Sequence, residues 1–122
     1  MSSHILIVDD DPSIRATLAE VLTDEGYHVQ TATNGAEGLS AIAESPPDVV
    51  LLDMRMPVLD GWGFARALGE RGVSVSIVVM TAAQEATLWA REIGAGSVLP
   101  KPFDLEVLLQ VVERALRSAA AD

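Results

Sequence analysis

Acidic side chains stand at the ends of apolar runs, and they are the residues best suited to chemistry in this sequence. Asp9 and Asp10 directly follow the run Ile5–Val8, and Asp53 directly follows Val49–Leu52. Carboxylates gathered in one place can hold a hard divalent cation through oxygen ligands. A carboxylate beside such a cation can also act as a nucleophile toward phosphorus.

Two further side chains follow apolar runs in the same way. Thr81 follows Ile77–Met80, and Lys101 comes shortly after Ser97–Leu99. A transferring phosphoryl group spreads its charge over three oxygens, so its transfer depends mostly on positioning and charge stabilisation. A magnesium ion, the Lys101 ammonium and the Thr81 hydroxyl could each hold one of these oxygens.

These side chains can meet only if the apolar runs are parallel strands. The runs lack alternation and are rich in β-branched residues, which is typical of strands covered on both faces. Helical spacing and capping signals separate them; Asn34, for example, heads a capping box, and Asp11 before Pro12 predicts an N-cap. Five strands alternating with five helices predict an α/β, doubly wound parallel sheet in the flavodoxin-like order 2-1-3-4-5, with Val29–Ala32 near an edge. Sites in such sheets lie at the carboxyl ends of the strands.

The composition limits the classes of function. The 122 residues carry a formal net charge of −10 and include no cysteine. The absence of cysteine excludes a thiolate nucleophile and a Cys-ligated zinc site. The negative net charge disfavours direct nucleic-acid binding by this domain, because phosphates attract basic surfaces. No apolar run is long enough to span a membrane. We expect a cytoplasmic protein with one domain over residues 1–118 and a frayed tail or linker start over residues 119–122.

Other polar and aromatic residues have simpler interpretations. His4 and His28 flank the starts of strands, at the wrong end of the sheet for the acidic cluster, and are interpreted as structural. Trp62 and Trp89 are interpreted as helix-packing residues rather than ligand-stacking residues. Asp11 is expected to cap its helix rather than to bind a metal.

Nearly the whole chain resembles the receiver domain of two-component response regulators, and specifically the chemotaxis type. The resemblance rests on four motifs: Val8-Asp9-Asp10, Leu52–Pro57 with Asp60-Gly61, Met80-Thr81-Ala82, and Lys101-Pro102-Phe103.

The resemblance implies that a sensor histidine kinase or a histidine phosphotransfer protein donates a phosphoryl group to Asp53. It implies a magnesium site, with manganese as a substitute, formed by Asp9, Asp10, Asp53 and the backbone carbonyl of Arg55. Thr81 and Lys101 would assist the transfer, and the peptide between Lys101 and Pro102 would be cis. The domain would be a switch that assists its own phosphorylation and dephosphorylation, not an enzyme.

Three alternatives to this function make different demands on the sequence. A haloacid-dehalogenase-like phosphatase would need a cap and a later acidic pair, for which 122 residues leave no room. A flavodoxin-like electron carrier would need a Ser/Thr-rich phosphate loop where this chain has Asp9–Asp11. A degenerate receiver, acting as an interaction module independent of phosphorylation, would lack part of the acidic and basic set.

The chain departs from the family pattern at two places. Val98 stands where receivers usually carry Tyr or Phe, so we expect activation to act through Thr81 and the loop after it. Val107 and Val111 replace charged residues on the last helix, whose core side is predicted to be Leu105, Leu108, Val112 and Leu116. The two valines predict either a wider core stripe that includes them or an apolar surface for a homodimer or a partner helix, near the fourth helix, fifth strand and fifth helix.

Overall fold

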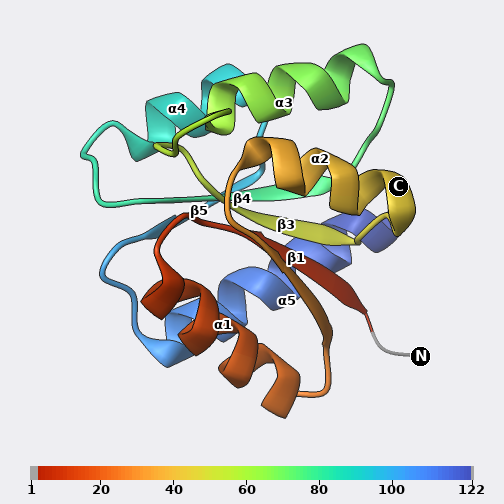
Figure 1. Ribbon diagram of the computed structural model, residues 1–122. Coiled ribbons are helices and arrows are strands. Elements are labelled where there is room, and N and C mark those ends of the chain that lie inside the picture. The colour runs from red at the N-terminus through yellow and green to blue at the C-terminus, as the bar shows by residue number, and fades with distance from the viewer. Residues whose placement is uncertain (1–2, 122) are drawn as a thin grey trace.

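The computed structural model describes residues 3–121 and shows strands and helices in strict alternation (Figure 1). The elements are β1 (His4–Val8), α1 (Pro12–Asp24), β2 (His28–Ala32), α2 (Gly35–Glu44), β3 (Val49–Asp53), α3 (Gly61–Glu70), β4 (Ser76–Thr81), α4 (Ala86–Ile93), β5 (Ser97–Pro100) and α5 (Leu105–Ala121). Each of the five predicted strands and five predicted helices is present. Within the described residues, no helix has the length and apolar character needed to cross a bilayer.

All neighbouring strands of the sheet are parallel, in the order β2-β1-β3-β4-β5. This confirms the predicted fold class and the edge position of β2. Helices α2, α3 and α4 cover one face of the sheet, and α1 and α5 cover the other (Figure 1). Because all strands run the same way, the residues that follow β1, β3, β4 and β5 meet at one edge.

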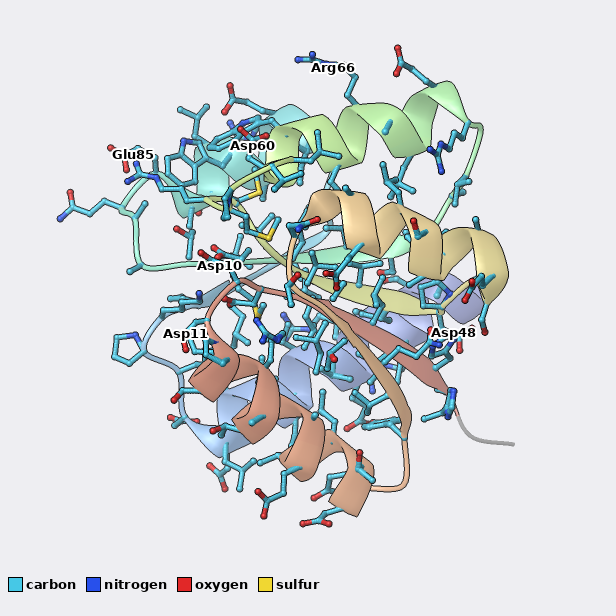
Figure 2. The ribbon with its side chains drawn as sticks, in the orientation of Figure 1. Asp10, Asp11, Asp48, Asp60, Arg66 and Glu85 are labelled. Carbon is cyan, nitrogen blue, oxygen red and sulfur yellow. The ribbon has the colours of Figure 1, made fainter. Side chains whose placement is uncertain are left out.

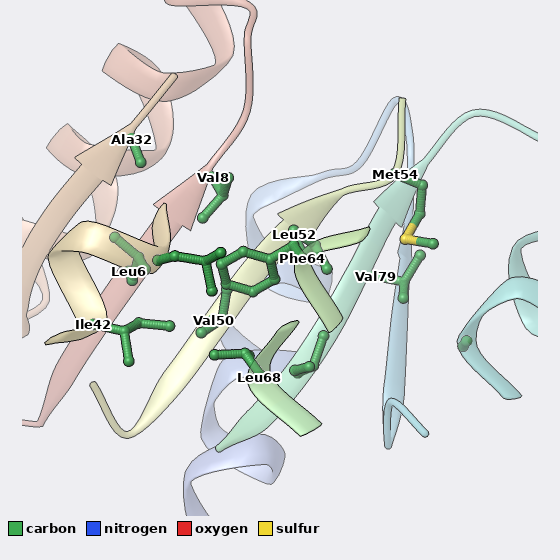
Figure 3. Close-up of a cluster of buried hydrophobic side chains, with 13 residues drawn as sticks. Leu6, Val8, Ala32, Ile42, Val50, Leu52, Met54, Phe64, Leu68 and Val79 are labelled. Carbon is green, nitrogen blue, oxygen red and sulfur yellow. The ribbon is translucent and has the colours of Figure 1, made fainter. Parts of the chain in front are cut away.

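Two apolar clusters hold the sheet between its helices. Leu6, Val50 and Leu52 point to one face, where they contact Phe64 of α3 (Figure 3). The alternate residues of the same strands point to the opposite face and contact α1 and α5. Full burial of β1 and β3 explains why their sequences show no polar alternation. The central strands are therefore fixed on both faces, and so are the carboxylates at their ends.

Helix α5 differs from the prediction in which residues it buries. The prediction that Leu105 lies on the core side is wrong. Leu105 is the first residue of α5 and is 52% exposed, and the first residue of this helix that is buried in the core is Leu108. Val111 packs against the α1/α5 cluster, whereas Val107 is 37% exposed. The predicted apolar surface is thus shifted toward the start of α5, and its use for self-association stays a prediction.

The sequence predicts a frayed tail or the start of a linker over residues 119–122. Residues 119–121 continue α5, and residue 122 lies outside the described residues. The interpretation of this stretch as the start of a linker stays a prediction.

Candidate functional site

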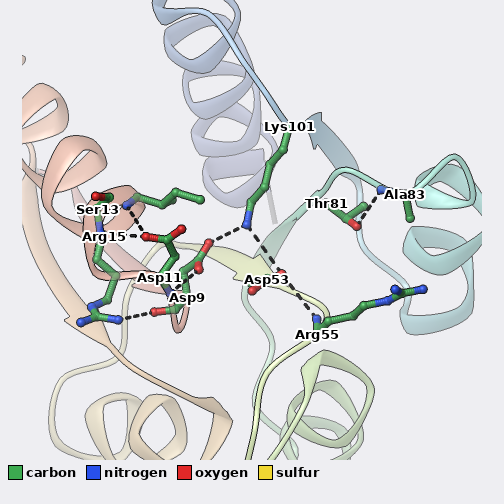
Figure 4. A network of polar contacts seen from close by, with 10 residues as sticks. Asp9, Asp11, Ser13, Arg15, Asp53, Arg55, Thr81, Ala83 and Lys101 are labelled. Carbon is green, nitrogen blue, oxygen red and sulfur yellow. Dashed lines mark hydrogen bonds and ion pairs between the residues drawn. The ribbon is translucent and has the colours of Figure 1, made fainter.

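The ends of four strands meet at the carboxyl edge of the sheet, and the predicted site residues lie at these ends or directly after them. Asp53 and Thr81 are the last residues of β3 and β4. Asp9 directly follows β1, and Lys101 directly follows β5. Figure 4 shows the side chains of Asp9, Asp53 and Lys101 pointing toward one another. The structure therefore brings the predicted residues together, while their chemical roles stay predictions.

The loop after Asp53 is held by a close approach of two backbones. The N–H of Gly61, the first residue of α3, donates to the carbonyl of Met54 at 3.0 Å. An added Cβ at Gly61 would lie only 2.8 Å from Cα of Met54. Asp60 caps α3 by accepting a hydrogen bond from the N–H of Gly63 at 2.9 Å. The Asp60-Gly61 pair thus starts α3 and fixes the chain immediately after the candidate acceptor.

The three carboxylates form a cluster that fits a hard divalent cation. Asp9, Asp10 and Asp53 each offer an oxygen, and these oxygens lie within 4.8 Å of one another. Asp9 is fully buried, whereas Asp10 is exposed at the rim. Figure 2 places Asp10 and Asp11 at this end of the sheet and Asp48 at the other. An all-oxygen set with an open side matches the preference of magnesium, which retains several of its waters.

The electrostatics of Asp53 agree with a site that accommodates positive charge. Burial, followed by the charge of Asp9, raises the pKa of Asp53 from 3.8 to about 6, although the charge of Lys101 acts in the opposite direction. Two carboxylates this close disfavour a second negative charge unless a cation is added. Because Asp53 is only 7% exposed, water screens this repulsion poorly.

Lys101 is the cation that the chain itself supplies. Its Nζ lies 2.9 Å from Oδ2 of Asp9 and 3.8 Å from Oδ1 of Asp53, so its closer partner is Asp9 (Figure 4). The backbone N–H of Lys101 donates to the carbonyl of Thr81 at 2.9 Å. The peptide between Lys101 and Pro102 is cis, as the resemblance implied. Lys101 is thus positioned between the two buried carboxylates.

A cleft of about 410 Å³ opens beside Asp53. Its lining includes Asp53, Arg55, Thr81 and Lys101, together with the backbone that follows β4. The Thr81 hydroxyl accepts a hydrogen bond from the N–H of Ala83 at 3.1 Å. That bond leaves the hydroxyl proton available to an oxygen placed in the cleft. The space is sufficient for a small anionic group on Asp53.

Two residues of α1 and its cap support the site: the role of Asp11 was predicted from the sequence, and that of Arg15 was not. Asp11 caps α1 by accepting hydrogen bonds from the N–H groups of Ser13 and Ile14, as predicted. Arg15, one turn later, donates to the carbonyl of Asp9 at 2.8 Å, which had not been predicted. The available signal was its place in the first turns of a helix that begins at the site.

The chain is similar in sequence to known regulators. A sequence model described as the response regulator receiver domain matches residues 5–113. The response regulator MprA of Mycobacterium sp. (strain KMS) is 40% identical over 124 residues, which cover all of this chain and 54% of MprA. The DNA-binding transcriptional regulator NtrC of Escherichia coli (strain K12) is 40% identical over 92% of this chain and 24% of NtrC. The chain thus spans about half or less of these two curated relatives.

Solved structures show the same likeness. The chemotaxis protein CheY4 of Vibrio cholerae superposes with a TM-score of 0.88 at 33% identity, over 95% of this chain and 100% of CheY4. NtrX from Brucella abortus gives a TM-score of 0.91 at 30% identity, over 99% of this chain and 28% of NtrX.

The chain belongs to the receiver-domain family of two-component response regulators. Receiver domains are switch domains rather than classical enzymes, and this membership is consistent with phosphorelay signalling.

Proposed function

We propose that this domain accepts a phosphoryl group on Asp53 in a magnesium-dependent step and thereby switches its partner surface. The observation that carries the proposal is the convergence of Asp9, Asp10, Asp53, Thr81 and Lys101 at one edge of the sheet. A degenerate receiver would lack part of this set, so the convergence favours a phosphoacceptor over an interaction module. The proposed donor is the phosphohistidine of a sensor histidine kinase or a histidine phosphotransfer protein. A cytoplasmic location stays a prediction.

The chemistry at Asp53 is nucleophilic substitution at phosphorus. A carboxylate oxygen of Asp53 forms the new P–O bond, and the P–N bond to the donor histidine breaks. The electron pair of that bond leaves with the imidazole nitrogen, which then takes up a proton from solvent. Lys101 and Thr81, which both line the cleft beside Asp53, would donate hydrogen bonds to phosphoryl oxygens.

Asp9, Asp10 and Asp53 would hold a magnesium ion, and manganese is the expected substitute because it also prefers oxygen ligands. We further propose that the backbone carbonyl of Arg55 contributes a ligand. When bound, the ion neutralises charge on the phosphoryl oxygens and on the carboxylate cluster. The raised pKa of Asp53 reflects burial and repulsion by Asp9, and a bound cation would relieve that repulsion once Asp53 is ionised near neutral pH.

The test is phosphorylation by acetyl phosphate, read as the gain of one phosphoryl group in intact mass. We expect a gain for the wild-type chain in magnesium, and none after chelation or in Asp53→Asn. Asp60→Asn is the matched control, because Asp60 is an exposed carboxylate in the same loop that caps α3. Phosphorylation of Asp53→Asn at the wild-type rate would show that the acceptor lies elsewhere.

A further inference from the structure

One cation and two aromatic rings connect the loop after Asp53 to α3 and α4. The guanidinium carbon of Arg55 lies 5.0 Å from the ring centroid of Trp89 in α4. The ring of Trp89 in turn meets the ring of Trp62 in α3 edge-to-face, with centroids 4.9 Å apart. A cation over a tryptophan face and an edge-to-face ring pair are both attractive arrangements. The stack therefore joins three segments that are separate in the sequence.

Arg55 also belongs to the candidate phosphorylation site. It lines the cleft beside Asp53, and its backbone N–H lies 3.4 Å from Oδ1 of that residue. Its side chain nevertheless extends away from Asp53 (Figure 4). Arg55 is an exposed residue, and its guanidinium lies over the ring of Trp89. In this state Arg55 thus contacts α4 while its backbone stays fixed at the cleft.

Helix α4 has weak local support at its N-terminus. Asp11, Asn34 and Asp60 cap α1, α2 and α3 with side-chain hydrogen bonds, but Glu85 makes no such bond at the start of α4. The buried residues of α4 are two alanines, Ala86 and Ala90, which offer little side-chain surface. The partly buried Trp89 packs against the same cluster as Trp62. Trp89 and Ile93 are the larger side chains that hold α4 against this cluster, so the position of α4 is sensitive to what Trp89 contacts.

We propose that Arg55 is a positioning residue that links occupancy of the cleft to α4 through Trp89; this inference rests on the proposed phosphorylation of Asp53. A phosphoryl group would bring nearly two negative charges to a cleft that Arg55 lines. A charge-assisted hydrogen bond between guanidinium and phosphoryl oxygen is stronger than an exposed cation–π contact. The guanidinium then leaves Trp89, the ring becomes more accessible, and the uncapped first turn of α4 is released.

The test measures the accessibility of Trp89 to the neutral quencher acrylamide. The chain has two tryptophans, so Trp62→Phe leaves Trp89 as the reporter. Acetyl phosphate with magnesium should raise the quenching constant roughly twofold, as the guanidinium leaves the ring. Arg55→Met in the same background should show the higher constant before phosphorylation and little further change. Arg55→Lys, which keeps the charge, should lie between these two.

The matched control is Arg114→Met, which removes an exposed arginine from α5 on the other face of the sheet and should respond like the parent. If a melting curve shows that Trp62→Phe is unfolded, the indole NMR signal of Trp89 in the unsubstituted chain provides the same readout.

Intact mass, recorded for each sample, separates the two hypotheses. A gain of one phosphoryl group with unchanged accessibility of Trp89 would overturn the coupling and leave the proposed function intact. No gain in mass would overturn the proposed function and the coupling with it. A response of the Arg55→Met chain equal to that of the parent would show that Arg55 is not the link.

Discussion

Burial and the nearby carboxylate of Asp9 both disfavour an ionised Asp53, and they raise its pKa from 3.8 to about 6. Between about pH 4 and about pH 6, the folded chain therefore holds a proton on Asp53 that the unfolded chain has released. In this window the contribution of Asp53 to the free energy of unfolding falls as the pH rises. Above the folded pKa the destabilisation is complete, and without a bound cation it persists at neutral pH.

Replacing Asp53 by Asn should remove this destabilisation. Without divalent cations, we expect Asp53→Asn to be more stable than the wild type near neutral pH by about 3 kcal/mol, an order-of-magnitude conversion of the raised pKa. The advantage should shrink as the pH falls through about 6 toward about 4. Urea unfolding at several pH values measures it. Asp24→Asn, at the far end of α1, is the control, and an advantage of Asp53→Asn that does not change with pH would contradict the prediction.

Val58, in the loop between β3 and α3, has a backbone conformation that its residue type disfavours. Its φ is +71°, although β-branched residues strongly avoid the left-handed region. The N–H of Leu59 donates to the carbonyl of Pro57 at 2.8 Å, which closes a tight three-residue turn around Val58. The side chain is 80% exposed, so no burial compensates for the strain.

Val58→Asn should relieve this strain, because Asn tolerates the left-handed region. We expect a gain of about 1 kcal/mol in the free energy of unfolding. Val58→Ile keeps the β-branch and should give no gain. Thermal unfolding of the two variants beside the wild type measures the difference. Equal stability of the Asn and Ile variants would mean that the turn stores no strain.

At the scale of elements, the residues at which helices begin were easier to predict than the contacts by which helices pack against one another. Asp11, Asn34, Asp60 and Asp104 each cap a helix, and their short-range signal is visible in the sequence. Helix α4 has no such cap, and its place against α3 depends on Trp62 and Trp89. Those tryptophans were correctly interpreted as packing residues, but a contact between residues far apart in sequence cannot be inferred from local spacing. Pro57 indicates a turn at this place, but nothing in the sequence predicts a positive φ at Val58, since β-branched residues strongly avoid it.

The C-terminus of α4 offers a clean test of helix-ending chemistry. Gly94 has a φ of +75°, and the N–H of Ala95 donates back to the carbonyl of Ala90 at 2.8 Å. A Cβ at Gly94 would meet no atom within 4 Å, and the same holds at Gly69 within α3. The two positions therefore differ in backbone conformation but not in available space.

Gly94→Ala should lower the free energy of unfolding by about 1 kcal/mol, because Ala is disfavoured in the left-handed region. Gly69→Ala should instead raise it by about 0.5–1 kcal/mol, because it reduces the entropy that the unfolded chain loses on folding. Chemical denaturation of both variants gives the comparison. A similar effect of the same sign in both would show that backbone conformation is not the deciding factor.

At the scale of the whole molecule, topology explains why the site could be predicted from so few residues. Parallel strands end at one edge, so residues after four different strands were expected to meet. Asp9, Asp53, Thr81 and Lys101 do so. The preference of Lys101 for Asp9 over Asp53 could not be predicted, since it depends on side-chain distances of a few ångströms.

Charge acts on the whole fold as well as on the site. The chain carries 18 acidic and 8 basic residues, and three of the acidic ones are gathered in the cluster of Asp9, Asp10 and Asp53. Repulsion among exposed charges weakens when salt is added, whereas repulsion between the buried carboxylates of Asp9 and Asp53 is screened much less. A cation bound at the cluster should therefore stabilise the fold beyond the effect of ionic strength.

Millimolar magnesium should raise the free energy of unfolding by about 1–3 kcal/mol, the value expected when the ion is present at tens to a hundred times its dissociation constant. Sodium chloride at equal ionic strength should give a smaller rise, because it screens the surface without binding the cluster. Asp10→Ala should abolish the magnesium-specific part and should itself stabilise the metal-free chain, since it removes one of three repelling carboxylates. Thermal melts in chelator, in sodium chloride and in magnesium measure both effects, with Asp24→Asn as the control. A wild-type chain that melts at the same temperature in chelator and in magnesium would show that the cluster binds no ion under these conditions.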